Sequence, residues 1–194
     1  MPSSATVTLF QTLDVESLDS GNQLPGDAVA KVKSQPDFQQ GFFGQKLEDP
    51  KTWVLATEWS SASAAKQCIT DIKDHVRAQE TFVYQFDTAV LKAPCTEVFT
   101  AFETEEGFEE QVGRFVSAVE GDKLEGYKGA DYGAEVKVDG GGTGEKSVRM
   151  VIGWVSKEAH VEAKGKPGAI QENIGELRAK RKGVDLFHVN FKEL

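Results

Sequence analysis

Histidines are the side chains of this 194-residue chain best suited to proton transfer, because imidazole titrates near neutral pH. In the last strand-like run, Leu186, His188 and Asn190 alternate with apolar side chains. We expect the apolar set to face a layer of helices, so that His188 and Asn190 point together into a cavity on the other side of the sheet. There His188 would act as a general base, and Asn190 would stabilise developing negative charge.

His160 is the second candidate base, because it stands at the start of a helical segment that follows Trp154. A surface or helix-packing role is the alternative for His160. For His188 the alternative is a hydrogen-bonded histidine at a sheet edge. The third histidine, His75, lies at a predicted helix C-terminus, where a partial positive charge complements the helix dipole.

Flat and cationic side chains supply candidate walls for a ligand. Trp59 and Trp154 each close a strand before a helix, where they would flank a ligand or fill the core. Tyr84 and Tyr127 add phenol groups. Arg149 lies in a strand that should be half-buried, so it needs an anionic partner, either a ligand carboxylate or an acidic side chain.

The elements that must position these groups follow a βαββαβ order in the first half of the chain. Runs rich in β-branched and aromatic residues predict strands, and apolar residues at helical spacing predict helices. The predicted elements are a strand over 5–13, a helix over 27–34, strands over 41–48 and 52–60, a helix over 61–75 and a strand over 81–91.

The second half repeats this order. Its predicted elements are a strand over 97–103, a helix over 105–120, strands over 126–138 and 146–155 around a Gly-rich turn over 139–144, a broken helical region over 156–182 and a strand over 184–192. Trp59 matches Trp154, 82–86 matches 187–191, and Phe42 matches Tyr127. These matches predict two repeats, over 1–93 and 94–194.

Each repeat would form an antiparallel sheet with helices on one face and an apolar face left over. Two such faces within one chain can cover one another. We therefore expect an α+β fold in which two ferredoxin-like βαββαβ repeats are fused into one intramolecular dimeric α+β barrel with helices outside. The lumen would hold a small hydrophobic molecule, and the chain would be a monomer built as a pseudo-dimer, with further oligomerisation left open.

Composition narrows the class of partner. A formal net charge of −9 argues against nucleic acid and anionic membrane surfaces, which attract clustered Lys and Arg. No signal peptide or membrane span is visible, and the two cysteines have no metal-ligand spacing, so the predicted location is the cytoplasm. No zinc, dinucleotide or haem-attachment motif is present. We expect no metal and no cofactor.

The stretch Trp154-Val155-Ser156-Lys157-Glu158-Ala159-His160 resembles the W-x-S-x-E-A-H signature of the antibiotic biosynthesis monooxygenase (ABM) group, within the dimeric α+β barrel superfamily. The first repeat keeps Trp59, Ser61 and the two alanines Ala64 and Ala65, but no histidine. The resemblance implies a tandem ABM-like, cofactor-independent monooxygenase acting on an aromatic or polyketide-like substrate. His188 or His160 would take the substrate proton, and Asn190 and Arg149 would stabilise the oxyanion.

The same family leaves other functions open, because it also includes cyclases, haem-degrading enzymes and members without known activity. A polyketide cyclase would use the same base without oxygen. Haem binding would need His160 or His188 as an axial ligand. A non-catalytic small-molecule-binding or stress-associated barrel is the remaining alternative.

Overall fold

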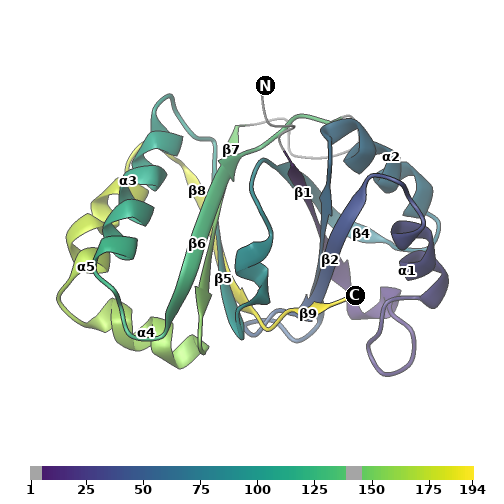
Figure 1. Cartoon of the computed structure of the whole chain (residues 1–194), viewed down its shortest axis with the longest axis horizontal. Helices are drawn as coiled ribbons and strands as arrows, with labels where there is room; N and C mark the ends of the chain where they lie inside the picture. The colour runs from purple at the N-terminus through teal and green to yellow at the C-terminus, as the bar shows by residue number, and fades with distance from the viewer. Residues whose placement is uncertain (1–5, 139–145) are drawn as a thin grey trace. The chain divides into compact units, whose positions relative to one another are not determined.

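The computed structural model describes residues 6–138 and 146–194, so the Gly-rich turn predicted over 139–144 lies outside the described residues. The chain forms two compact units (Figure 1). Unit 1 comprises Met1–Thr88, Val136–Gly144 and Lys192–Leu194, and unit 2 comprises Ala89–Glu135 and Glu145–Phe191. The chain therefore passes between the units more than once.

Unit 1 is an antiparallel sheet of order β4-β1-β3-β2-β9 with helices on one face. Alternating residues of β1, such as Leu9 and Leu13, pack with Trp59 against Ala65 and Ile72 of α2. The elements are β1 (Val7–Asp14), η1 (Val15–Ser17), α1 (Gly26–Lys33), β2 (Phe38–Gln45), β3 (Thr52–Trp59), α2 (Ala62–Ile72), β4 (Ala78–Tyr84) and β9 (Lys192–Glu193).

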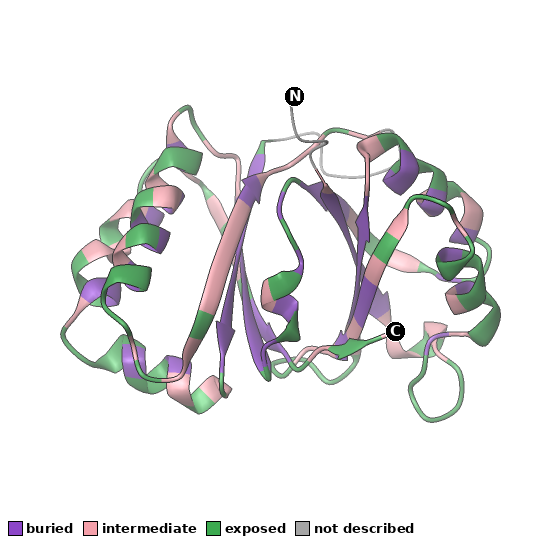
Figure 2. Ribbon diagram, in the orientation of Figure 1, coloured by how far each residue is buried: buried purple, intermediate pink, exposed green. Residues whose placement is uncertain are grey.

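Unit 2 is an antiparallel sheet of order β6-β7-β5-β8, also with helices on one face. Phe99 of β5 and Met150 of β7 pack against Phe115 of α3, and every residue of β7 is buried (Figure 2). The elements are η2 (Ala89–Lys92), β5 (Cys95–Phe102), α3 (Phe108–Gly121), β6 (Tyr127–Ala134), β7 (Ser147–Trp154), α4 (Lys157–Gly165), α5 (Ala169–Asn173), η3 (Ile174–Leu177) and β8 (Gly183–Val189). The predicted α+β class is confirmed.

The strand pairings within the two sheets correspond, so residues of one unit can be matched to residues of the other. Val7 pairs with Trp59 in unit 1 as Cys95 pairs with Trp154 in unit 2. Tyr127 pairs with Trp154 across a bulge, and in unit 1 the residue that pairs with Trp59 across a bulge is Phe38. The sequence match of Tyr127 to Phe42 was therefore wrong.

Three predicted elements are divided in the structure. The strand over 81–91 becomes β4, which ends at Tyr84, and η2. The helical region over 156–182 becomes α4, α5 and η3, because Pro167 and Gly168 interrupt it and Gly168 has a φ of 147°. The strand over 184–192 becomes β8 in unit 2 and β9, which pairs with β2 in unit 1. None of the helices in the described part of the chain has the length and apolar character needed to cross a membrane.

Candidate functional site

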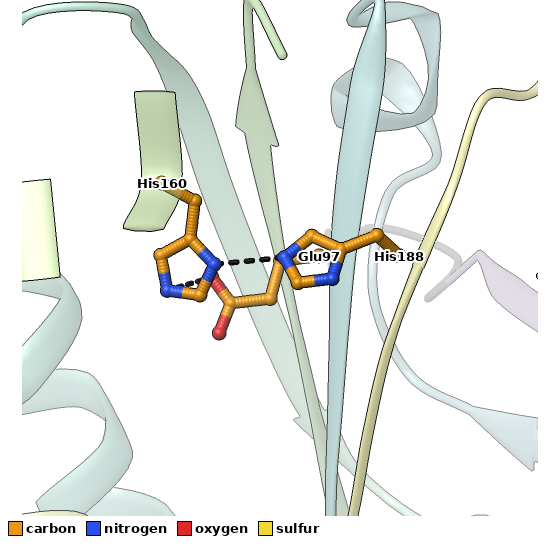
Figure 3. Close-up of side chains that lie close together, drawn as sticks. All are labelled: Glu97, His160 and His188. Carbon is orange, nitrogen blue, oxygen red and sulfur yellow. Dashed lines mark hydrogen bonds and ion pairs between the residues drawn. The ribbon is translucent and has the colours of Figure 1, made fainter. Parts of the chain in front are cut away.

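Glu97, His160 and His188 form a connected group of buried side chains in unit 2, here called the triad (Figure 3). The His160 ring contacts each of the other two groups through one of its nitrogens (Figure 3). Its Nδ1 is 2.7 Å from His188 Nε2, and its Nε2 is 3.4 Å from Glu97 Oε2. No more than 5% of any of the three residues is exposed. The three titratable groups form a compact cluster, in which one ligand atom from each lies within 4.8 Å of the others.

Strand register and a helix cap bring the triad together. Glu97 of β5 pairs directly with His188 of β8, so both side chains lie on one face of the sheet. This is the face that carries Cys95 and Phe99 toward the helices. The Ser156 side chain accepts a hydrogen bond from the Ala159 amide and starts α4, which places His160 one residue later, over the same face.

The orientation expected for His188 was wrong. Apolar residues stand on both faces of β8, and pairing with β5 places Leu186 and His188 on the helix-bearing face, with Phe187 on the other. Asn190 follows the end of β8 and is exposed. The structure therefore joins His188 to His160 and not to Asn190.

Burial governs the charge of Glu97. The carboxyl is enclosed, and loss of hydration raises the pKa of Glu97 from 4.5 to about 7. A hydrogen bond from Trp154 Nε1 to Glu97 Oε2, 3.2 Å long, and the positive charge of Lys164 act in the opposite direction and lower that pKa. The group is thus able to gain or lose a proton near neutral pH.

Aromatic contacts hold the His160 ring in place. The Trp154 ring stacks on it, with centroids 5.2 Å apart and planes 22° apart. Tyr127 in turn packs edge-on against Trp154 at 5.9 Å, and its hydroxyl donates a 3.5 Å hydrogen bond to Glu120. Burial raises the pKa of Tyr127, so the phenol stays protonated. Trp154 and Tyr127 therefore support the triad, which is a positioning role.

The triad can pass a proton along its length. If His160 Nε2–H donates to the Glu97 carboxylate, Nδ1 of His160 is an acceptor for an Nε2–H of His188. Proton transfer along these two contacts would move a proton from His188 to Glu97, and the 3.4 Å contact between His160 and Glu97 would have to shorten for this step. The geometry is that of a carboxyl–imidazole–imidazole relay.

Two histidines and a carboxylate are also a common ligand set for transition metals, and their ligand atoms lie within 4.8 Å of one another. In this geometry, however, His160 directs one ring nitrogen to each partner. A shared ion would take the place of the 2.7 Å contact between the two imidazoles. The arrangement fits a proton relay better than a metal centre.

The matched positions of unit 1 are apolar. Leu9 pairs with Val83 as Glu97 pairs with His188, and Ala65 is the fourth residue after the capping Ser61, as His160 is after Ser156. All three unit 1 residues are buried. The indole N–H of Trp59, which has no glutamate to reach, donates to Thr57 Oγ1 at 2.9 Å.

The remaining predicted site residues lie elsewhere. Trp59 is part of the unit 1 core, and Tyr84 is buried in the same unit beside Phe82 and Phe86. Arg149 is buried on the face of the unit 2 sheet opposite the helices, where its Nε donates to Thr100 Oγ1 at 2.9 Å. Of the predicted residues, the structure gathers only His160, His188, Trp154 and Tyr127.

A cavity of about 610 Å³ lies beside the triad, between the sheet and the helices. Two of its lining residues are neighbours of the triad. Phe99 lies two residues after Glu97 on β5, and Leu186 lies two residues before His188 on β8, so each is about 7 Å along the strand from its triad residue. Lys164 lies one helical turn after His160. The triad side chains themselves do not line the cavity.

Sequence reasoning missed Glu97 and this cavity. A usable signal was present, because Glu97 interrupts an alternating apolar set formed by Cys95, Phe99 and Ala101. An ionisable residue on such a face is buried and must find partners.

Known proteins share the fold of this chain. No protein-family model and no curated protein sequence matches it. Among solved structures, an anthrone oxidase-like protein superposes with a TM-score of 0.69 at 12% identity, over 98% of this chain and 93% of the other. A protein from Fusobacterium nucleatum provisionally named a monooxygenase gives 0.61 at 8% identity, over 100% and 95%. A mutant chlorite dismutase from Candidatus Nitrospira defluvii gives 0.59 at 12%, over 97% and 92%. These are dimeric α+β barrel proteins.

Proposed function

We propose that the protein is a monooxygenase-like enzyme that oxygenates a small hydrophobic, aromatic or polyketide-like molecule without a cofactor. In this proposal the triad of Glu97, His160 and His188 accepts the proton that the substrate loses. The observation that carries the proposal is the buried triad at positions where unit 1 has leucine, alanine and valine.

Three buried ionisable groups destabilise a core relative to apolar side chains. Burying a polar or charged group costs free energy unless its partners are ideal, and apolar replacements of similar size are often neutral or stabilising. Unit 1 fills the same positions with Leu9, Ala65 and Val83, so this architecture does not need the triad to fold. Proton transfer is a function that would justify its presence in unit 2.

The chemistry requires a substrate anion that reacts directly with oxygen. For an anthrone, removal of a ring-carbon proton gives an electron-rich anion, and attack of this anion on O₂ leads to anthraquinone and one water. The relay would take the first proton. One similar structure is named anthrone oxidase-like, and others are provisionally named monooxygenases, which supports this class of reaction.

The substrate position proposed here differs from the lumen expected from the sequence. His160 and His188 lie on the helix-bearing face, and the cavity that begins at Phe99 and Leu186 opens on that face. We place the substrate in this cavity. Side-chain movement of the Phe99–Leu186 layer would let it reach the relay.

We propose that the units are diverged ABM-like repeats, over 1–93 and 94–194, that close as one fused barrel. Arg149 and Tyr84 would line its lumen, because both lie on sheet faces away from the helices. The chain would then be a cytoplasmic monomer. The shared register of the two sheets supports a common origin.

The test replaces the triad with the unit 1 residues. The variant Glu97→Leu/His160→Ala/His188→Val should remain folded and lose at least a hundredfold in oxygen uptake with anthrone, as expected for loss of a general base. The control is His75→Gln, which removes the remaining histidine, paired with Asp27 on the surface of unit 1. Oxygen consumption and anthraquinone absorbance measure the result.

Unchanged turnover in the folded triple variant would refute the relay. Wild-type protein that binds anthrone but never consumes oxygen would favour the non-catalytic binding protein, and turnover to a cyclised product without oxygen would favour the cyclase. An intense haem absorption band in the purified protein would overturn cofactor independence.

A further inference from the structure

We infer that the cavity beside the triad takes a molecule with an apolar body and one carboxylate, and that Lys164, Arg178 and Arg181 hold the carboxylate. The inference rests on the proposed function, since it names the substrate class of the same site. It goes further, because neither the triad nor the fold specifies a charged ligand.

The walls of the cavity are apolar and open. Phe99, Ile170 and Leu177 are buried in the core of unit 2, whereas Val184 and Leu186 on the edge strand β8 are 47% and 41% exposed. Large apolar side chains that remain exposed on a concave surface favour an apolar ligand over bulk water. They provide the surface for the body of the molecule.

The charges around the cavity all have one sign. Lys164 of α4 and Arg178 and Arg181, which follow η3, line it, and none of the described residues that line it is acidic. The whole chain has a formal net charge of −9. The cavity lining, with three cations and no acidic residue, therefore has the opposite sign of charge to the chain as a whole. Such a cluster is complementary to an anion.

Two of the cations are tied to neighbouring features. The guanidinium of Arg181 lies over the Phe99 ring, 6.0 Å from its centroid, and its Nε donates to the Leu177 carbonyl at 2.6 Å. Arg181 thus contacts the apolar wall of the cavity and belongs to its group of cations. Lys164 is close enough to Glu97 for its charge to lower the pKa of that carboxyl. A carboxylate bound at Lys164 would offset this effect and raise the proton affinity of the Glu97 carboxylate, which is the acceptor end of the proposed relay.

The experiment is a calorimetric titration with anthraquinone-2-carboxylate and with its uncharged amide of the same shape. Wild-type protein should bind the carboxylate at least tenfold more tightly than the amide. Lys164→Gln/Arg178→Gln should reduce this preference severalfold, because only Arg181 remains, and should leave amide affinity within twofold, because the apolar walls are intact. Arg181 is left unchanged, because its bond to Leu177 supports the backbone.

The control is Lys73→Gln/Arg77→Gln, which removes one lysine and one arginine from exposed positions in unit 1 and should keep the wild-type preference. Equal affinity for carboxylate and amide, absence of binding, or an equal loss in both double variants would each overturn the inference. Anthraquinone is already oxidised, so the result does not depend on turnover. A protein that never consumes oxygen but shows the predicted preference would refute the proposed function and leave the carboxylate site standing.

Discussion

Glu97 is the residue that makes this site depend on pH. Its carboxyl is buried under α4 and receives a hydrogen bond from Trp154, but these contacts do not replace the lost hydration, so its pKa rises to about 7. In the unfolded chain the same group has its ordinary value of 4.5. Between these two values the folded protein holds the proton more tightly than the unfolded chain does.

The stability of the wild-type protein should therefore fall relative to Glu97→Gln as the pH rises. The contribution of Glu97 is fully present below pH 4.5 and is lost as the pH rises through 7, and its size corresponds to about 3 kcal/mol. Urea denaturation of both proteins measures the difference in their free energies of unfolding. A range of about pH 4 to 8 covers both pKa values of Glu97. If the stability of the wild-type protein relative to Glu97→Gln stayed constant or rose with pH, Glu97 would be ionised in the folded state.

The triad also shows what sequence can and cannot predict at this scale. His160 and His188 were identified because their residue type and position suggested a base. Their contact depends on two facts that no local pattern contains: the register that pairs Glu97 with His188, and the packing of α4 over that pair. Alternation could not orient His188, because Phe187 and Leu186 are both apolar.

At the scale of elements, α4 is the part of the scaffold on which the relay depends most. Ser156 caps its first turn, and His160 lies in that turn. Helix α2 in unit 1 has the same cap, in which Ser61 accepts from the Ala64 amide, but Ala65 stands in place of the histidine. The two helices form a matched pair that differs in the functional residue.

Ser156→Ala and Ser61→Ala should each lower the free energy of unfolding by about 1 kcal/mol, the usual cost of losing an N-cap. Only Ser156→Ala should also reduce turnover severalfold, because fraying of the first turn moves His160 away from His188. Chemical denaturation and oxygen uptake measure the two effects. Equal turnover in both variants would mean that His160 is held by Trp154 stacking alone.

Most elements could be predicted from the sequence because their residues follow clear periods. Most strands and helix α3 appear within a few residues of their predicted bounds, but the strand predicted over 81–91 ends at Tyr84, and η2 follows at Ala89–Lys92. The last segment also differs, because one apolar run was predicted there as a single strand. Phe191 ends its unit 2 part, and Lys192–Glu193 pairs with Phe42 and Phe43 of β2 in unit 1. Such a change of sheet depends on distant pairing and leaves no local pattern.

At the scale of the whole molecule, each sheet has a face without helices that carries large apolar side chains among polar ones. In unit 1 this face carries Phe10 beside Phe86, with Phe82 and Tyr84 on the neighbouring strand. In unit 2 it carries a set of buried apolar residues: Val98, Val151, Phe187 and Val189. Faces of this composition are not stable in water.

If one chain supplies both faces, as the proposed fused barrel requires, no second copy is needed to cover them. We therefore expect a monomer of 21.2 kDa by light scattering, at concentrations from micromolar upward and with no dependence on concentration. The triple variant of Glu97, His160 and His188 should have the same mass, because its substitutions lie on the opposite, helix-bearing face of unit 2. A mass of about twice this value that falls on dilution would contradict the expected monomer and show that two chains pair. The triad and its cavity, which lie within unit 2, would be unaffected.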